Sequence, residues 1–407
     1  MLSAEDNETI TRTGPGTAMG KLMRQFWTPA IRSARLVADA APERVRLLGQ
    51  DFVAFRASNG QAGFFDERCP HRGVSLSLAR NENGELKCIY HGWKFHVSGK
   101  VAEVPTEPAA TREAFAQRVR LRHYPVREAG GILWVWLGDG VPAEFPRLNW
   151  LDLPPEQLRV RLGVIPCNWL QGLEGQLDSA HVGVLHQDQI NPQKRSDNIG
   201  KVAFDSAPRF DFEVMPYGFR EAALRSLPDG SQYARVREFV MPYYSYIPRG
   251  ARNERQHLTI AVPVDDTTSA QWDVYYNLEA PLTLEDLGVD FDVNPDDCAV
   301  GLGSIDNRFG QNREAMSSGS SFSGFSSIRF EDFAVNSAQG PIADRTIENL
   351  SSSDLPIVRT RRMLLQAARS AARGELAMPD ASTVDWSAIR AVDEVMPAGG
   401  EWRALPR

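Results

Sequence analysis

Two short loops in the first third of the sequence each combine one cysteine with one histidine. The first reads C-P-H-R-G from Cys69, and the second reads C-I-Y-H-G-W from Cys88, with sixteen residues between His71 and Cys88. The two thiolates, with the imidazoles of His71 and His91, are the ligand set of a [2Fe-2S] cluster in which one iron carries two histidines. Neutral imidazoles raise the potential of such a cluster to roughly −150 to +300 mV. The four residues therefore predict a centre that accepts electrons from a low-potential donor and passes them on.

Structural zinc sites also use two cysteines and two histidines, so zinc is the alternative to iron. A zinc finger usually pairs its cysteines in one knuckle and its histidines in another, whereas each loop here contains one of each. Gly73 and Gly92 follow the histidines, where the backbone must bend closely around an inorganic core. Trp93 is placed to shield that core from water. The spacing favours the iron–sulfur cluster, of the kind called a Rieske centre.

A second group of metal-binding residue types lies further along the chain. Asp178 and His181 are three residues apart and share one face of a predicted helix, with Glu174 one turn earlier. His186 is five residues past His181, which in a regular helix turns it about 140° away. If both histidines bind one metal, we expect the helix to distort or to end near Gly183.

Two imidazoles and one carboxylate form the facial triad of a mononuclear non-haem Fe(II) centre, which leaves positions open for O₂ and substrate. We expect the carboxylate to come from Phe330-Glu331-Asp332-Phe333, and we favour Asp332, with Glu331 as the alternate. The competing interpretation is that the histidines are ordinary core residues and Asp332 is a surface acid. The Rieske motif argues against it, because a redox centre of this kind needs an electron acceptor.

Three regions are expected to position these groups. Residues 1–40 are predicted to form an N-terminal helical segment, with its helix over Gly14 to Pro29, that packs on the catalytic domain. Short alternating runs and turn residues predict an all-β cluster domain over residues 41–150. A proline-rich boundary then leads into a catalytic domain over residues 151–407.

The catalytic region alternates strand-like runs with helices, which predicts an α+β domain with an antiparallel sheet. One helix is expected from Trp169 to about His186, and another from Pro356 to Gly374. The Ser/Gly-rich stretch from Ser317 to Ser327 is expected to be a loop near an active site. The predicted strands run over Arg159 to Ile165, Phe210 to Val214, Arg235 to Pro242, His257 to Val264 and Gln271 to Leu278.

The composition narrows the class of protein. The 407 residues are 42% hydrophobic and 24% charged with a net charge of −7, which gives no support for a nucleic-acid partner. The N-terminus lacks a basic and an apolar targeting region, and the longest apolar run, Ile132 to Leu137, is far too short to span a membrane. We expect a cytoplasmic protein in which Cys167 and Cys298 are reduced thiols.

Long stretches of the chain resemble the oxygenase α subunits of the Rieske non-haem iron aromatic-ring oxygenases, in the phthalate dioxygenase-like branch. These are T-R-T-G-P-G-T-A-M-G-K-L-M-R-Q-F-W-T-P-A, C-N-W-L-Q-G-L-E-G-Q-L-D-S-A-H-V-G-V-L-H and Q-G-P-I-A-D-R-T-I-E-N-L-S-S-S-D. The family motif D-x₂-H-x₄-H is matched at Asp178, His181 and His186, and its late acid is best matched by Asp332. The resemblance implies a Rieske domain joined to a helix-grip catalytic domain, in a homotrimer or a multiple of it.

The resemblance also implies how the two centres communicate. Asp178 would accept hydrogen bonds from His181 in its own subunit and from His91 of the partner subunit, and would so bridge the cluster of one chain to the iron of the next. Glu174 and Asn168 belong to the same motif, with roles left open. Because the chain has no G-x-G-x-x-G or flavin signature, an NADH-dependent flavin and iron–sulfur reductase is the expected partner.

The implied reaction is dihydroxylation of a substituted aromatic carboxylate, similar to phthalate, chlorobenzoate or phenoxybenzoate, with O₂. The alternative is a Rieske monooxygenase that demethylates or hydroxylates a related aromatic. A non-catalytic electron carrier or ligand-binding module is a third possibility, against which the length of the chain and the second metal site both argue. A buried substrate carboxylate would need a guanidinium partner. The candidates are Arg220, Arg225, Arg235 and Arg237.

Overall fold

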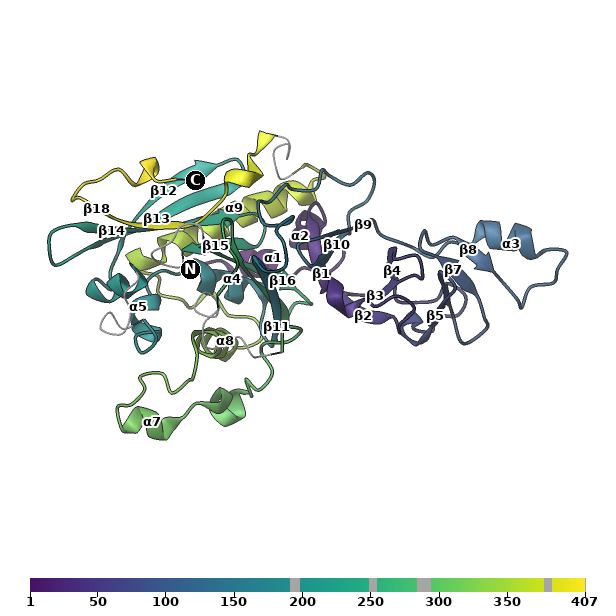
Figure 1. The fold of residues 1–407 in the computed structure, drawn as a ribbon, viewed down its shortest axis with the longest axis horizontal. Helices are drawn as coiled ribbons and strands as arrows, with labels where there is room; N and C mark the ends of the chain where they lie inside the picture. Colours follow the sequence, from purple (N-terminus) through teal and green to yellow (C-terminus); the bar gives the residue numbers. More distant parts are fainter. Residues whose placement is uncertain (191–197, 249–254, 284–293, 377–382, 407) are drawn as a thin grey trace. The chain divides into compact units, whose positions relative to one another are not determined.

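The computed structural model describes residues 1–190, 198–248, 255–283, 294–376 and 383–406. The chain divides into two compact units (Figure 1). The larger unit combines Met1–Leu22 with Glu144–Arg407, and the smaller unit is Met23–Ala143. Within the described ranges, no helix is long and apolar enough to cross a membrane.

The smaller unit is built from three small antiparallel sheets, with strand orders β1-β10-β9, β2-β3-β4 and β5-β6-β7-β8. Its strands are β1 (Trp27–Arg32), β2 (Glu43–Leu47), β3 (Gln50–Arg56), β4 (Ala62–Asp66), β5 (Arg80–Glu82), β6 (Glu85–Lys87), β7 (Lys94–His96), β8 (Val101–Glu103), β9 (Val126–Ala129) and β10 (Ile132–Trp136). Helix α3 (Arg112–Arg118) and the 3₁₀ turns η1 (Ser33–Arg35) and η2 (Leu76–Leu78) complete it.

The predicted helix over Gly14 to Pro29 is wrong in its second half. The chain forms only the short helix α2 (Ala18–Met23) and then enters β1. Pro29 does not end a helix but lies in an edge strand, next to a register shift between Pro29 and Ile31. Proline is tolerated there because an edge strand at a bulge does not need every N–H for its ladder.

One large antiparallel sheet organises the larger unit, in the order β11-β17-β16-β15-β14-β13-β12, with β18 paired to β14. The strands are β11 (Leu158–Ile165), β12 (Arg209–Met215), β13 (Gly218–Ser226), β14 (Gln232–Val240), β15 (Tyr244–Pro248), β16 (Arg255–Pro263), β17 (Ser269–Asn277) and β18 (Val392–Met396). This confirms the predicted α+β class, with an all-β domain beside a domain built on an antiparallel sheet.

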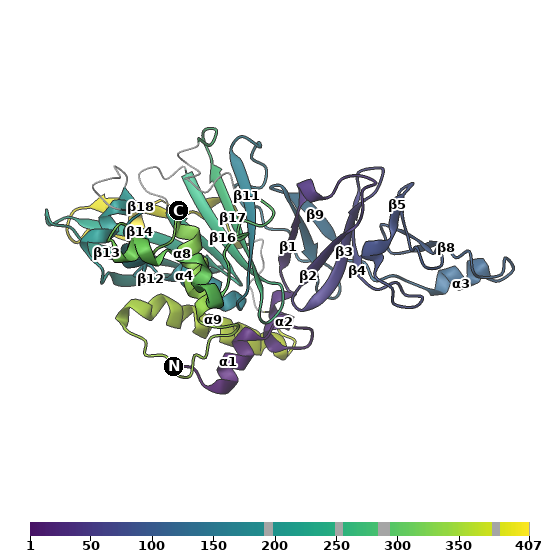
Figure 2. The same ribbon diagram turned by 90° about the horizontal axis from the view of Figure 1, so that it is seen from below.

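Helices cover this sheet (Figure 2). The described helices of the larger unit are α1 (Ala4–Thr11), α4 (Trp169–Leu177), α5 (Val182–Leu185), α7 (Arg313–Ser317), α8 (Ile328–Ala338) and α9 (Leu355–Ala372), with 3₁₀ turns η3 (Asn198–Phe204), η4 (Ile305–Gly310), η5 (Ser352–Asp354), η7 (Trp386–Ala388) and η8 (Trp402–Ala404). Helix α4 packs against β15, β16 and β17, and α8 and α9 pack against α4. The apolar face of α4 is therefore enclosed, and its C-terminal end is fixed over the sheet.

Candidate metal centres and substrate cavity

The two Cys/His loops of the smaller unit have the same backbone hydrogen bonds. The N–H of Gly73 donates to the carbonyl of Cys69, and the N–H of Gly92 donates to the carbonyl of Cys88, both at 2.9 Å. Both glycines lie in the left-handed region, with φ of 73° and 71°. A residue with a Cβ is strained in that conformation. The sequence therefore folds into two equivalent turns, each of which presents one thiol and one imidazole.

The side chains of these loops fit an iron–sulfur cluster. Cys69 and Cys88 are each 2% exposed, and the rings of His71 and His91 lie 4.4 Å apart. Trp93 stacks on His71 at 4.5 Å. The Nδ1 atom of His71 is buried and has no hydrogen-bond partner among the described residues, as expected of an atom whose partner is a metal.

Burial, together with the neighbouring Cys88, raises the pKa of the Cys69 thiol to about 11. A thiolate at Cys69 is therefore unfavourable unless a metal centre compensates its charge. A [2Fe-2S] cluster would supply that compensation.

The second site begins where α4 ends. The sequence predicts a helix to about His186 with a distortion near Gly183, but α4 stops at Leu177 and α5 is a separate short helix. The cause is Asp178, whose Oδ1 accepts hydrogen bonds from the backbone N–H of Ala180 at 2.7 Å and of His181 at 3.3 Å. A side chain that bonds to its own neighbouring backbone competes with the helix.

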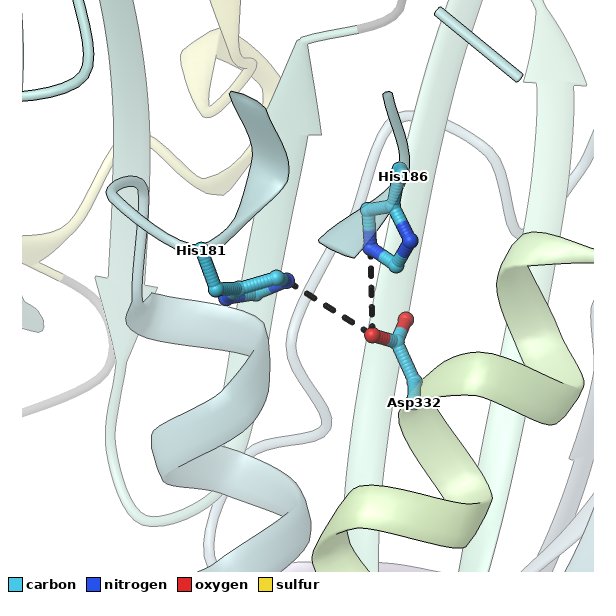
Figure 3. A group of neighbouring side chains, drawn as sticks. All are labelled: His181, His186 and Asp332. Atoms are coloured by element: carbon cyan, nitrogen blue, oxygen red, sulfur yellow. Dashed lines mark ion pairs between the residues drawn. The ribbon is translucent and has the colours of Figure 1, made fainter. Parts of the chain in front are cut away.

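This break brings His181 and His186 to one side, where they face Asp332 from α8 (Figure 3). Nε2 of His186 lies 3.2 Å from Asp332 Oδ1, and Nε2 of His181 lies 3.6 Å from the same oxygen. One donor atom from each residue lies within 4.8 Å of the other two. The structure thus assembles the two-histidine, one-carboxylate group that the sequence predicts, a donor set that suits Fe(II) with open positions.

The electrostatics of this group favour a cation. Burial alone lowers the pKa of His186, but Asp332 and Glu331 outweigh it and raise the pKa to about 9. Burial likewise opposes the charge on Asp332, yet the two histidines hold the pKa of Asp332 far below its usual range. A site that stabilises bound protons on its histidines beside an ionised carboxylate also stabilises a metal ion in their place.

Each histidine has a second carboxylate on its other ring nitrogen. Asp178 Oδ2 lies 3.3 Å from His181 Nδ1, and Glu331 Oε2 lies 2.6 Å from His186 Nδ1. Glu331 therefore lies outside the triad, on the far side of the imidazole ring, while the neighbouring Asp332 carboxylate lies inside it. Carboxylates in this outer position fix the tautomer and the orientation of metal-binding histidines.

Other polar residues of the α4 motif have structural partners. Asn168 caps α4 by accepting from the N–H of Leu170 at 3.1 Å. Glu174 is buried between Arg345 and Arg361, at 2.8 and 2.6 Å. Burial alone raises the pKa of Glu174, and the two guanidiniums outweigh it and lower the pKa. Glu174 therefore lies in an ion-pair network that anchors α4, away from the triad.

A cavity of about 520 Å³ opens beside the triad. Its apolar wall contains Val182, Ile190, Ile199, Ile247, Pro248, Ile328 and Phe333. An apolar chamber of this size with a few polar groups is typical of a small-molecule site. Asp178 also lines the cavity, so the carboxylate behind His181 is reached from the same space.

A polar cluster in the cavity wall was not expected from the sequence. His257 Nε2 lies 3.0 Å from Asp273 Oδ1, and Asp273 pairs with Arg329. Arg329 and Arg161 donate to the hydroxyl of Tyr275 at 3.1 and 3.2 Å. These residues come from β11, β16, β17 and α8, so they come together only in the folded protein. No local spacing in the sequence predicts the cluster.

The four candidate arginines of β13 and β14 have different environments. Arg220 Nε donates to the buried Glu238 at 2.8 Å, and Arg220 does not line the cavity. Arg225 Nη2 donates to the carbonyl of Ser179 at 2.7 Å. Arg225 thus supports the segment that follows α4, directly beside Asp178.

The remaining two arginines both line the cavity. Arg237 pairs with Glu221 at 2.7 Å and donates to the carbonyl of Gln176 at 3.0 Å, so it also holds the end of α4. Arg235 is 3% exposed and donates from Nη2 to the carbonyl of Pro248 at 3.2 Å. Its Nε and Nη1 atoms have no hydrogen-bond partner in the part of the chain that the structure describes.

Comparisons with known proteins agree with both sites. Residues 26–125 match the model of the Rieske [2Fe-2S] domain, and residues 135–406 match the model described as LigXa C-terminal domain like. The chain is 38% identical to the phthalate 4,5-dioxygenase oxygenase subunit of Pseudomonas putida, over 99% of this chain and 94% of the relative. It is 36% identical to the 3-chlorobenzoate-3,4-dioxygenase oxygenase subunit of Comamonas testosteroni, over 91% and 89%.

A third relative, 31% identical over 92% of this chain and 82% of its own length, is the 5,5'-dehydrodivanillate O-demethylase oxygenase subunit of Sphingobium sp. (strain NBRC 103272 / SYK-6). Among solved structures, the terminal oxygenase of carbazole 1,9a-dioxygenase from Nocardioides aromaticivorans IC177 has the same fold, with a TM-score of 0.61 at 18% identity over 90% of this chain and 98% of that one. The chain therefore belongs to the Rieske non-haem iron aromatic-ring oxygenases, as an oxygenase α subunit of the phthalate dioxygenase-like branch, with a [2Fe-2S] cluster and a mononuclear iron as its cofactors.

Proposed function

We propose that this protein is the terminal oxygenase component that dihydroxylates a substituted aromatic carboxylate, using O₂ and electrons from a separate reductase. The relatives named for phthalate and chlorobenzoate support this substrate class. The observation that carries it is Arg235, a buried guanidinium in the cavity beside the triad, two of whose nitrogens have no hydrogen-bond partner among the described residues.

The ligand assignments follow the two donor sets. Cys69, His71, Cys88 and His91 hold the [2Fe-2S] cluster, and the triad of His181, His186 and Asp332 holds Fe(II). When bound, these groups supply electron transfer and the activation of O₂. The chain's own contribution is to orient the histidines through their outer carboxylates and to present the substrate from an apolar chamber.

Arg235 is the group that we assign to the substrate carboxylate. Burial lowers the pKa of its guanidinium, because the charged form loses its water without gaining a full set of acceptors. A carboxylate in the cavity would supply those acceptors through a charge-assisted pair. Of the other candidates, Arg220 and Arg237 already pair with buried glutamates, and Arg225 does not line the cavity. Arg235 lines the cavity and, among the described residues, donates only to a main-chain carbonyl, which supports Arg235 over them.

Electron transfer is proposed to pass through Asp178 between chains. We assign to Asp178 a hydrogen bond with His181 in its own subunit and with His91 of the partner subunit, in a homotrimer or a multiple of it. The 3.3 Å contact of Asp178 with His181 Nδ1 supports the first of these bonds. Only the carboxylate form offers enough acceptor sites for two imidazoles and the two backbone N–H groups that it already binds.

The domain roles and the partner complete the proposal. Residues 41–150 are assigned as the Rieske domain and residues 151–407 as the catalytic domain, with the N-terminal residues 1–40 packed on the latter. The packing of α1 against α9 supports the last assignment for its helix, while the chain from Met23 lies in the smaller unit. An NADH-dependent flavin and iron–sulfur reductase in the cytoplasm is proposed as the electron donor.

A monooxygenase or demethylase is the second candidate, because one relative is named an O-demethylase. Product mass separates the two. Purified protein with a surrogate reductase, NADH and air is given substituted benzoates, phthalates, phenoxybenzoates and methoxybenzoates. A gain of two oxygens and two hydrogens, or release of a phenol from an aryl ether after such a gain, establishes the dioxygenase. A gain of one oxygen or the loss of a methyl group establishes the alternative.

A further inference from the structure

Glu331 contacts a histidine of the triad without belonging to the triad. Its Oε2 lies 2.6 Å from His186 Nδ1, and its Oε1 accepts a hydrogen bond from Ser323 Oγ at 2.5 Å. Glu331 is 0% exposed and Ser323 is 5% exposed. Both oxygens of this buried carboxylate are engaged, so any rotation would leave one of them without a partner. The imidazole of His186 is thereby fixed with Nε2 toward Asp332.

Ser323 belongs to the Ser/Gly-rich segment from Ser317 to Ser327, and this segment also contacts the chain just after His186. Asp188 Oδ2 accepts a hydrogen bond from the backbone N–H of Phe322 at 2.6 Å and from Ser321 Oγ at 3.1 Å. Asp188 lies three residues past the end of α5 and two residues past His186, the C-cap of α5. The segment is therefore bonded to the chain after α5 through Asp188 and to α8 through Ser323.

These contacts matter because the triad is assembled from two elements. His186 is the cap of α5, and Asp332 lies on α8. A metal needs the lone pair of Nε2, so the proton of the neutral imidazole must lie on Nδ1. In that tautomer the Nδ1–H of His186 donates to Glu331, so the carboxylate favours the form of the imidazole that binds metal.

We propose that Glu331 is a positioning residue for His186 and that Ser323 fixes Glu331, so that this one serine of the Ser/Gly-rich segment supports the metal site. This inference rests on the proposed iron ligands. A role confined to folding would change the stability of the protein but would leave the affinity for metal and the spectrum of the bound metal unchanged.

The test uses the full-length protein with its cluster oxidised and its mononuclear metal removed by a chelator. Co(II) binding is measured by equilibrium dialysis with elemental analysis, and the electron paramagnetic resonance spectrum of the bound Co(II) is recorded. The variants are Glu331→Ala, the similarly sized Glu331→Gln, Ser323→Ala and Ser323→Thr. Ser320→Ala is the matched control, since the Ser320 hydroxyl contacts only Ser318 and the carbonyl of Ala315 among the described residues.

We expect Glu331→Ala to weaken Co(II) binding by about 10- to 100-fold, the usual cost of losing such a partner. Glu331→Gln and Ser323→Ala should weaken Co(II) binding less than this and should shift the Co(II) spectrum. Ser323→Thr, which keeps the hydroxyl, and the control Ser320→Ala should have the affinity and the spectrum of the parent protein. If Glu331→Ala does not fold, the Glu331→Gln and Ser323 variants still test the proposal. Unchanged affinity and spectrum in the Glu331→Gln and Ser323→Ala proteins overturn the inference, whereas failure of the parent protein to bind one Co(II) overturns the ligand assignment itself.

Discussion

Each histidine of the triad uses one ring nitrogen for the metal site and the other for a carboxylate. His181 pairs with Asp178, and His186 pairs with Glu331. The two carboxylates differ in exposure, because Glu331 is fully buried whereas Asp178 lines the cavity. This difference supports two roles at the residue scale, with Glu331 as a fixed support and Asp178 as a group available to a further partner.

Arg235 should determine affinity for the substrate carboxylate. The substitution Arg235→Gln removes the charge-assisted pair with the substrate carboxylate, which is worth about 1.5–3 kcal/mol. The KM should therefore rise by about 10- to 100-fold, with a smaller change in kcat. Steady-state oxygen uptake with the substrate found in the product screen measures both constants. The exposed Arg362→Gln is the matched control.

The primary amide of the same substrate sharpens this prediction. The amide should be a poor substrate for the parent protein and should lose nothing further in Arg235→Gln, since the charge pair is already absent. An equal loss of acid and amide in the variant would show that Arg235 supports the cavity without contacting the carboxylate.

Asp178→Asn should keep both metal centres and lose turnover. The amide retains the size of the side chain but has a single acceptor oxygen, so it cannot serve both histidines as a carboxylate does. Iron and sulfide analysis should match the parent protein, while stopped-flow single turnover of the reduced protein should slow by orders of magnitude. Asp229→Asn, in an exposed turn, is the control. Turnover retained in Asp178→Asn would contradict the bridging role.

At the scale of elements, the decisive feature is the end of α4. Arg237 donates to the carbonyl of Gln176, Arg225 donates to the carbonyl of Ser179, and Asp178 bonds to the backbone that follows it. The break is therefore fixed from both sides. It turns α5 so that histidines five residues apart face one carboxylate, which a continuous helix would not allow.

The start of α4 is equally well anchored, and this gives a prediction about stability. Asn168 caps the helix and donates to the carbonyls of Thr11 and Asp266 at 3.0 and 2.7 Å. Asn168→Ala should lower the free energy of unfolding by about 2–4 kcal/mol, because a cap is lost and two carbonyls lose their donor. Asn312→Ala, at the cap of the exposed helix α7, should cost only about 1 kcal/mol. Equal losses in denaturant titrations would contradict the structural role assigned to Asn168.

Local patterns in the sequence were sufficient for some elements and not for others. The strands β11, β12, β14, β16 and β17 follow their predicted runs. Helix α9 begins one residue before its predicted proline and ends two residues before its predicted glycine. Strand β13 was not predicted, because it carries three buried charged residues, Arg220, Glu221 and Arg225, whose partners lie on other segments. Glu238 pairs with the first, Arg237 pairs with the second, and the carbonyl of Ser179 accepts from the third, so the partners meet only after folding. The end of α4 was placed too late, because an aspartate that breaks a helix has the same sequence signal as one that remains on its face.

The same limit applies to the site. The triad histidines follow from spacing and the family resemblance, and the structure brings Asp332 to them. The roles of Glu331 and Ser323 could not be derived from the sequence. Nothing in the residues around Glu331 shows which ring nitrogen of His186 its carboxylate contacts. Arg235 was one of four equivalent candidates until the partners of the other three were known.

At the scale of the whole molecule, each compact unit contains one of the two redox donor sets, and each set is complete within its own unit. The mass of the oligomer in solution tests directly our proposal that electrons pass between chains. Sedimentation equilibrium should give three or six times the chain mass of 45.2 kDa. A monomer at micromolar concentration would contradict transfer through Asp178 between subunits.

The central claim is that the cavity beside His181, His186 and Asp332 is where an aromatic carboxylate is dihydroxylated by O₂. The most direct measurement is product mass after turnover under ¹⁸O₂, with the best substrate from the screen and a surrogate reductase. We expect a dihydroxylated product in which both new oxygens carry the label, and no product from the Asp332→Ala protein. A product with a single labelled oxygen, or labelled product from Asp332→Ala, would contradict it.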